Sequence, residues 1–369
     1  MDKSKKLRQS NLELLRIIAM FSILCFHCVF HSKAVIEPFG LNHYLVQSFL
    51  ILGKFGVNLY VLISGYFMIK SRFRWEKVIL LICEMYFYNI FIGIISYLWT
   101  SSPFSFAGMI KHTLHGISHP WFLTVYIMVY ILSPFINKMI LNLTQIQLKR
   151  LIIITTFIWS VIPTAVSLFN GGNSENLLYF NDFIIFIVIY IIGAYLRLYP
   201  SGVFNSKKSS ALIAVLSYAF IFGFMFVYDR FSDILKPETS MYFIKQNSVF
   251  IILLSIGVFC LFKDMNIKNS AVINTVASSV LGIYLLHDNK ISKTFIWNDL
   301  LDMKTRLSGD FAVLYILGFC IAIFIVGFVI DIFRQFIEKY TLAKLLESSA
   351  YKKSKSYIAD KYIKVISKL

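Results

Sequence analysis

The sequence predicts an all-α integral membrane protein, and three observations support this fold class. Hydrophobic residues make up 58% of the 369 residues and charged residues only 15%, whereas soluble domains average roughly 45–50% and about 25%. The mean hydropathy is +0.71. Apolar runs of about 20 residues, the length that crosses the hydrocarbon core as a helix, recur along the chain. We therefore expect lipid to be the solvent of much of the protein surface.

The apolar runs predict about ten transmembrane helices. They leave no room for a separate soluble domain, so we expect residues 1–334 to form one polytopic transmembrane domain, followed by a basic cytoplasmic tail at 335–369. The expected spans are 12–31, 47–69, 78–99, 121–140, 151–169, 180–198, 210–228, 246–262, 271–287 and 311–333.

The distribution of Lys and Arg predicts that both termini are cytoplasmic. With the N-terminus inside, 25 of the 36 Lys and Arg residues fall on the cytoplasmic side, ten fall on the opposite side and Arg16 lies within the first span. Cytoplasmic loops carry such an excess of basic residues. We therefore interpret the net charge of +17 as a sign of membrane orientation and lipid contact, and we do not expect nucleic acid as a partner.

The first span, NLELLRIIAMFSILCFHCVFH, contains residues that are costly inside a membrane: Glu13, Arg16 and His27. Eleven residues separate Arg16 from His27, which is about three helical turns, so both share one face and lie roughly 16 Å apart along the axis. A guanidinium suits a phosphate or carboxylate, and an imidazole suits proton transfer. The alternatives are an arginine that snorkels at a helix end and a histidine that only packs against another helix.

Arg16 and His27 also match the R-x10-H signature of the acyltransferase-three family of membrane-bound enzymes, and further segments resemble this family in the same order. GKFGVNLYVLISGYFMI resembles its second-helix pattern, HPWFLTVYIMVYILSPFIN its Trp-Phe-Leu segment, and SSVLGIYLLH its Tyr-Leu-Leu-His pattern. The resemblance extends to about residue 330. It implies transfer of an acyl group, mostly acetyl, from cytoplasmic acyl-CoA to sugars or other envelope acceptors.

The sequence departs from the family at the third helix, where many members carry arginines thought to help hold the donor. The segment here reads WEKVILLICEMYFYN, without an arginine. The resemblance leaves two alternatives: acetyl-CoA, as a co-substrate and not a tightly bound cofactor, contacts Arg16 together with Arg72 and Arg74 of the preceding loop, or this protein belongs to a subgroup with a different donor contact. Glu13 would orient Arg16, since it precedes it by three residues. The loop arginines are equally typical of topology signals.

The catalytic role falls to His27, which we expect to act either as the general base for an acceptor hydroxyl or as a transient acyl carrier. Candidates for the acceptor side are His287, Trp121 and Glu84. The simpler alternatives are an interfacial histidine, a tryptophan at a helix start and a carboxyl group bonded to another helix. The histidines of the loop before Trp121 lack an accompanying carboxylate or cysteine, so we expect no metal site.

These inferences together predict a membrane-bound O-acyltransferase in a bacterial inner membrane. It would move an acetyl group from acetyl-CoA to a hydroxyl of an envelope or capsular glycan or its lipid-linked precursor, with membrane lipids as further contacts. One alternative is a transporter or flippase of lipid-linked glycans, since intramembrane Arg, Glu and His also suit substrate pathways. Another is an acyltransferase that uses a different acyl group or a non-sugar acceptor.

Overall fold

The computed structural model describes residues 8–34, 40–100, 120–169, 181–200, 206–231 and 241–341, together with Lys344 and Ser348. These residues form helices, and no β-strand occurs among them. The predicted all-α fold class is therefore confirmed. The final helix continues to Tyr340, and most of the tail predicted at 335–369 lies outside the described residues.

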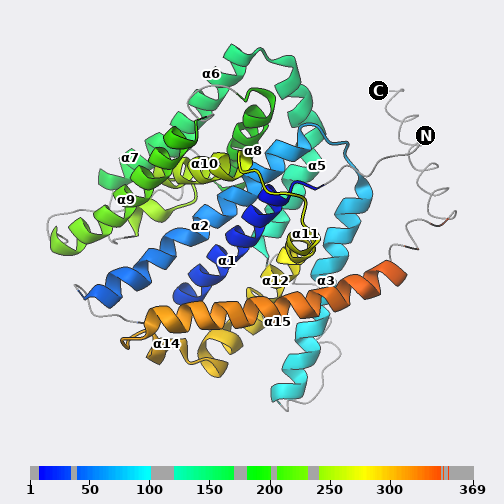
Figure 1. Cartoon of the computed structure of the whole chain (residues 1–369), viewed down its shortest axis with the longest axis vertical. Helices are drawn as coiled ribbons and strands as arrows, with labels where there is room; N and C mark the ends of the chain where they lie inside the picture. Colours follow the sequence, from blue (N-terminus) through cyan, green and yellow to red (C-terminus); the bar gives the residue numbers. More distant parts are fainter. Residues whose placement is uncertain are drawn as a thin grey trace.

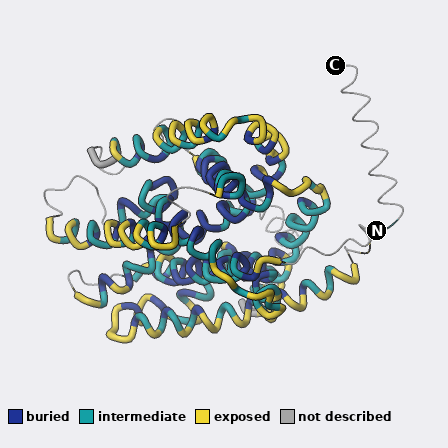
Figure 2. The backbone as a smooth tube through the Cα atoms, turned by 45° about the horizontal axis from the view of Figure 1, so that its top comes forward, coloured by how far each residue is buried: buried dark blue, intermediate teal, exposed yellow. Residues whose placement is uncertain are grey.

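Two long helices, α1 (Ser10–Ser32) and α2 (Leu41–Met68), lie side by side at the centre of the molecule (Figure 1). More than half of the residues of each helix are buried, and Figure 2 shows that buried residues gather in the interior of the molecule. Gly56 permits the close approach, because a Cβ there would lie 2.7 Å from the carbonyl oxygen of Ala19. Small residues serve this purpose at helix contacts in membranes.

Helices α5 (Trp121–Asn142) and α8 (Asp182–Leu198) pack against α2 and join it through buried polar groups. The Asn137 amide donates a hydrogen bond of 2.9 Å to the Met68 carbonyl, and the Tyr190 hydroxyl donates one of 2.7 Å to Asn137 Oδ1. In a lipid environment, interhelical hydrogen bonds of this kind help to fix which helices are neighbours.

The remaining helices enclose this centre on two sides. Helices α6, α7, α9 and α10 lie on one side of α2, and α3 and α15 lie beside α1 and α12 (Figure 1). Their bounds are α3 Trp75–Thr100, α6 Gln145–Thr156, η1 Phe157–Val161, α7 Ile162–Phe169, α9 Lys207–Phe231, η4 Tyr242–Ile244, α10 Val249–Lys263, α11 Ala271–Ser278, α12 Val280–His287, α13 Lys290–Thr294, η5 Phe295–Leu300, α14 Met303–Arg306 and α15 Ala312–Tyr340.

The chain bends sharply after α12. The axis of Ala271–His287 makes an angle of 74° with that of Lys290–Leu300. Asn289 starts the second helix, since its side-chain oxygen accepts a hydrogen bond of 3.0 Å from the Ile291 amide, and its own amide donates one of 2.9 Å to Asn89 on α3. The bend leaves His287 at a helix end inside the protein.

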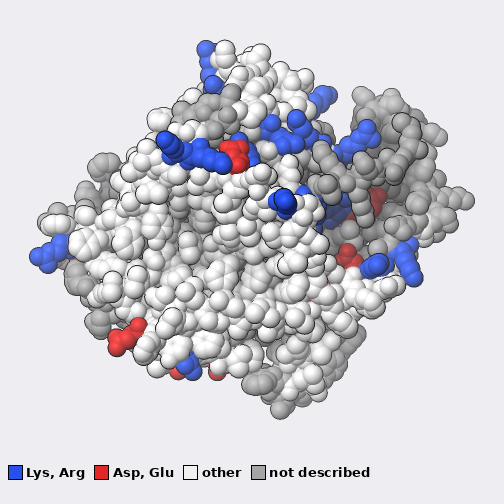
Figure 3. Space-filling model, in the orientation of Figure 1, with Lys and Arg blue, Asp and Glu red and all other residues white. Residues whose placement is uncertain are grey.

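Seven helices of the described chain are long and apolar enough to cross a membrane, and an eighth is reached if the bent pair is one span. Helices α8 and α10 are apolar but shorter, with 17 and 15 residues. Ile321, Ile325 and Val329 form an exposed apolar stripe on α15, as expected for a lipid-facing surface. Figure 3 shows few charged side chains across the middle of one face. The protein is therefore a multi-pass membrane protein.

Candidate active site

Two of the predicted site histidines lie together although they are 260 residues apart in the chain. His27 of α1 and His287 of α12 are joined by a hydrogen bond of 2.9 Å between His27 Nδ1 and His287 Nε2. Both side chains are buried, with exposed fractions of 8% and 0%. Because a buried imidazole needs hydrogen-bond partners, each histidine stabilises the other in this position.

The hydrogen bonds define which ring nitrogens carry protons. His287 Nδ1 lies 2.6 Å from the Ile283 carbonyl oxygen, which only accepts, so His287 donates from Nδ1. In the neutral ring Nε2 of His287 is then an acceptor, and His27 must donate to it from Nδ1. When the His27 ring is neutral, its Nε2 therefore carries no proton, which is the state that a general base requires.

Asp288 and His31 lie on the other side of His27. Asp288 Oδ1 is 3.8 Å from His27 Nε2, and it accepts a hydrogen bond of 3.3 Å from His31 Nε2. When His27 Nε2 takes a proton, the carboxylate stabilises the resulting positive charge. The cluster therefore places a second imidazole against one ring nitrogen of His27 and a carboxylate near the other.

His27, His31 and Asp288 line a cavity of about 490 Å³, within the usual range of small-molecule sites. The predicted acceptor-side residue Trp121 lines the same cavity, at the start of α5, and so do Tyr60 and other aromatic residues. His287 is not among the lining residues; it lies behind His27. The structure thus places Trp121 on the cavity wall and gives His287 contact with the cavity through His27.

Arg16 lies further toward the start of α1 and lines two other cavities, of about 410 and 320 Å³. Arg72 and Arg74 line the first of these with Arg16, as does Lys77. The structure therefore brings the three predicted donor-binding arginines together around one cavity, and their contact with a donor stays a prediction. The second cavity receives further basic side chains from Arg8, Lys70 and Arg197.

Glu13 contacts two of these basic residues. Arg16 donates a hydrogen bond of 3.2 Å to one Glu13 oxygen, and Arg8 Nε lies 3.3 Å from the other. Arg197, from the last turn of α8, donates a hydrogen bond of 2.8 Å to the Tyr66 hydroxyl. Glu13 is buried, whereas Arg16 lines both cavities; the structure brings the two side chains together, and the orienting role of Glu13 stays a prediction.

Two of these cavities share α1 and α5 in their walls. One is the cavity of about 410 Å³ lined by Arg16, Arg72 and Arg74, here called the basic cavity, and the other is the cavity of about 490 Å³ beside His27, here called the aromatic cavity. Tyr60 lines the aromatic cavity, and its hydroxyl donates a hydrogen bond of 2.7 Å to the Arg16 carbonyl. On α5, Phe122 lines the aromatic cavity and Tyr126, one turn further, lines the basic one; their stacked rings are 6.1 Å apart. Tyr60 and Phe122 therefore separate two chemically different compartments.

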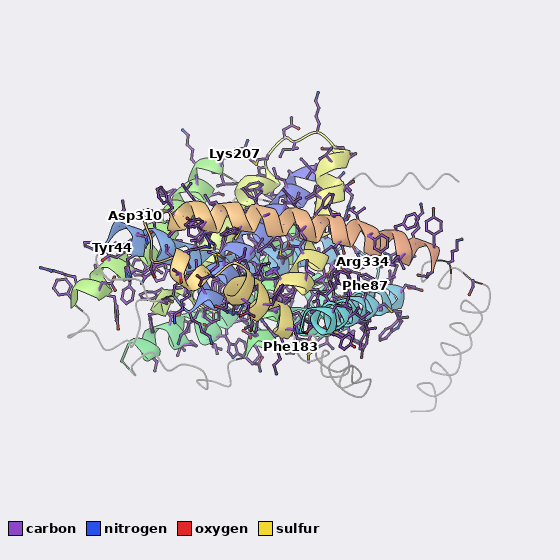
Figure 4. The ribbon with its side chains drawn as sticks, turned by 90° about the horizontal axis from the view of Figure 1, so that it is seen from below. Tyr44, Phe87, Phe183, Lys207, Asp310 and Arg334 are labelled. Carbon is purple, nitrogen blue, oxygen red and sulfur yellow. The ribbon has the colours of Figure 1, made fainter. Side chains whose placement is uncertain are left out.

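Glu84, the third acceptor-side candidate, does not lie near His27. It lines a cavity of about 510 Å³ between α3 and α15, where Arg334 Nη2 lies 3.3 Å from its carboxylate. Figure 4 shows Arg334 on α15 beside Phe87 of α3, which lines the same cavity. Arg334 also donates a hydrogen bond of 2.6 Å to Asp331. Its charge thus compensates two intramembrane carboxylates at a distance from the histidine pair.

One group of described residues has the geometry to hold a metal ion. The ligand atoms of His27, His31 and Asp288 all lie within 4.8 Å of one another. The hydrogen bonds given above already engage His31 and Asp288 with each other. The loop histidines considered from the sequence lie in 101–119, outside the described residues, so the expectation of no metal site stays a prediction.

Sequence reasoning missed His31, Asp288, Lys54 and Arg197. The first two carried a signal, since His31 follows His27 by four residues on the same helix face and Asp288 follows His287 directly. Lys54 lies within the second apolar run, but its charge entered only the count of Lys and Arg residues on each side of the membrane. Arg197 gave no signal beyond a basic residue at a helix end.

Comparison with known proteins agrees with this arrangement. The model of the acyltransferase-three family, described as an acyltransferase domain, matches residues 9–332. No curated protein and no solved structure matches the chain. The matched region contains both histidines of the pair and Arg16, Arg72 and Arg74 of the basic cavity. The chain therefore belongs to the acyltransferase-three family and is a membrane acyltransferase.

Proposed function

We propose that this acyltransferase moves an acetyl group from cytoplasmic acetyl-CoA to a hydroxyl of an envelope or capsular glycan, or of its lipid-linked precursor, in a bacterial inner membrane. The proposed topology has about ten crossings, with α8 and α10 as two of them, and both termini in the cytoplasm. One observation carries the proposal: a single helix holds a base in an aromatic cavity and an arginine in a basic one.

Contacts at the two ends of α1 support the proposed orientation. At its start, the Asn11 amide donates a hydrogen bond of 2.9 Å to the Phe262 carbonyl, and Ser10 donates one of 3.0 Å to Asn274. At its end, Asn298 donates one of 3.3 Å to the His31 carbonyl. The contacts of Ser10 and Asn11 lie on the side of the membrane that carries the excess of Lys and Arg. This supports placing the start of α1 at the cytoplasmic surface.

The donor would bind at the cytoplasmic end. Coenzyme A carries several phosphate charges, and arginine forks are suited to phosphate oxygens. Arg16, Arg72 and Arg74 offer three guanidinium groups around one cavity, which supports this location. The long pantetheine arm would then extend past Tyr60 toward His27, roughly 16 Å along α1.

The reaction needs one proton to be moved. The acceptor hydroxyl would give its proton to His27 Nε2 while its oxygen attacks the thioester carbonyl. The acyl C–O bond forms, the C–S bond breaks, and the CoA sulfur leaves as a thiolate that then takes a proton. His287 keeps the His27 ring in the required tautomer, and Asp288 stabilises the imidazolium that forms between these steps.

The test uses the full chain in liposomes with acetyl-CoA labelled in the acetyl group and a membrane glycan fraction as acceptor. His27→Ala is expected to lower transfer by about 10²–10⁴-fold, the usual contribution of a general base. Arg16→Ala is expected to raise the KM for acetyl-CoA, whereas Arg150→Ala, an exposed arginine outside both basic cavities, should change neither parameter. Full transfer activity in both site variants would refute the mechanism.

Two further readouts of the same assay address the open alternatives. Labelled protein that accumulates without acceptor, and disappears in His27→Ala, would identify His27 as an acyl carrier. Faster transfer from succinyl-CoA than from acetyl-CoA would keep the enzyme class and change the acyl group.

A further inference from the structure

We infer that the acceptor carries a negative charge, a carboxylate or a phosphate, close to the hydroxyl that is acylated. This inference rests on the proposed function, because it names the class of molecule that binds in the cavity beside His27. The observation that carries it is a convergence of lysines on that cavity from three separate segments of the chain.

The lining of the cavity is strongly biased toward positive charge. Lys54 of α2, Lys245 after η4 and Lys293 of α13 all line it. Among the described lining residues the only carboxylate is Asp288, and this group accepts the hydrogen bond from His31. A second carboxylate, Asp182 at the start of α8, acts electrostatically on Lys54 without lining the cavity. Among the described lining residues, lysines from three segments of the chain therefore converge on a cavity with one carboxylate, which is already hydrogen-bonded.

Lys54 is the most informative of the three. It lies in the middle of a 28-residue apolar helix, where a cation is costly and normally marks function. Its ammonium group lies over the Trp121 ring at 4.5 Å from the centroid, a contact that leaves N–H donors available for a further partner. The lysine and the tryptophan thus present a charge and an aromatic face side by side.

A topological explanation does not account for these lysines. In the proposed orientation the cavity lies along the outer half of α1, on the side of the membrane where basic residues are depleted. Lys290 and Lys293 show the contrast on one short helix: the side chain of Lys290 is exposed, whereas Lys293 lines the cavity. A lysine needed only for solubility or for membrane orientation would be exposed, as Lys290 is.

The rest of the lining fits a glycan that bears the anion. Trp121, Tyr60 and Phe122 provide flat apolar surfaces on which the faces of sugar rings can pack. His27 Nε2 would accept the hydroxyl proton, and the lysine ammonium groups would bind anionic oxygens nearby by charge-assisted hydrogen bonds. A uronic acid and a sugar phosphate share this chemistry.

The experiment compares three acceptors with the full chain in liposomes: an oligosaccharide that contains a uronic acid, its carboxyl-reduced counterpart, and the reduced sugar carrying a phosphate. We expect kcat/KM to be about tenfold or more higher for an anionic acceptor than for the neutral one, the ratio that one charge-assisted hydrogen bond supplies. The better of the two anionic acceptors identifies the source of the charge. Equal kcat/KM values for all three would overturn the inference.

The variants Lys54→Gln and Lys293→Gln assign the effect to the cavity. Each is expected to reduce the anionic-to-neutral ratio of kcat/KM toward one, whereas Lys290→Gln should preserve it. A ratio that stays unchanged in both cavity variants would also overturn the inference.

Equilibrium dialysis of the labelled acceptors separates this inference from the proposed function. One outcome is that none of the three acceptors is acylated, but an anionic acceptor binds more tightly than the neutral one and loses this advantage in Lys54→Gln. The proposed reaction then fails and the anion site stands. If acylation occurs without any preference in binding or turnover, the reaction stands and the anion site fails.

Discussion

At the residue scale, the molecule shows how polar groups are accommodated in an apolar interior. Turn arithmetic on the sequence placed Arg16 and His27 on one helix face, because that relation is local. The partner of His27 was not predictable as a partner, since His287 is 260 residues away and only the packing of α12 on α1 brings them together. His287 was expected at the cavity wall, but its contacts are those of a group that orients His27.

Replacement of His287 tests this orienting role. His287→Leu removes the acceptor for His27 Nδ1–H, so we expect kcat to fall by about 10²-fold or more with little change in the KM for acetyl-CoA. His287→Gln retains an acceptor oxygen and should recover part of the loss. Steady-state kinetics in liposomes measure both values; equal kcat values for the Leu and Gln variants would argue against a role through the hydrogen bond.

Arg334 provides a second residue-scale test, of stability. Its removal in Arg334→Met leaves Glu84 and Asp331 without their cationic partner, and breaking a buried ion pair typically costs 3–5 kcal/mol. We expect a clear fall in the midpoint of thermal unfolding of the detergent-solubilised protein. Lys339→Gln on the exposed face of the same helix serves as control, and an equal effect of the two variants would contradict this account.

At the element scale, the sequence predicted which segments form helices, but it did not predict where two helices cross each other. Every expected span falls on a described helix or helix pair, because hydrophobic length alone predicts it. The sequence did not predict the bend after His287, which depends on Asn289 and its bond to Asn89. It also did not indicate that α2 and α8 cross in direct backbone contact. At that crossing a Cβ on Gly65 would meet the Tyr190 carbonyl, and one on Gly193 the Leu62 carbonyl.

The crossing predicts that Gly65→Ala and Gly193→Ala force α2 and α8 apart. Because Gly65 follows Ser64, which lines the basic cavity, we expect both a lower unfolding midpoint and a higher KM for acetyl-CoA. Gly223→Ala and Gly318→Ala, where a Cβ would meet nothing within 4 Å, are matched controls that should stay at or above the wild-type midpoint. Unchanged behaviour of the first pair would mean that the helices tolerate a wider spacing.

At the scale of the whole molecule, two cavities lie along one helix: a basic cavity near its start, and a cavity further along that is lined by aromatic residues and lysines. Composition and charge counting predicted a polytopic protein with a basic inner side, because both depend only on residue type. They could not predict the lysines gathered at the aromatic cavity, since Lys54, Lys245 and Lys293 come from three separate segments. Their convergence is a property of the tertiary fold.

The proposed orientation is testable on the whole molecule with single cysteines. Lys268→Cys, near the start of α1, should react with a membrane-impermeant maleimide only after cells are permeabilised, and Lys304→Cys should react in intact cells. Both positions are exposed, whereas four of the five native cysteines are buried and Cys83 is partly so. Labelling in the reverse pattern would invert the topology and place the basic cavities outside.

The pairing of His27 with His287 also has a consequence for biosynthesis. The helix that carries His27 leaves the ribosome first, and its partner emerges 260 residues later. Until then the imidazole lies in the bilayer without its acceptor, a costly arrangement for a polar group. We therefore expect that a chain that ends before α12 inserts its first helix but never assembles the histidine pair, and that such incomplete translation products transfer no acyl group.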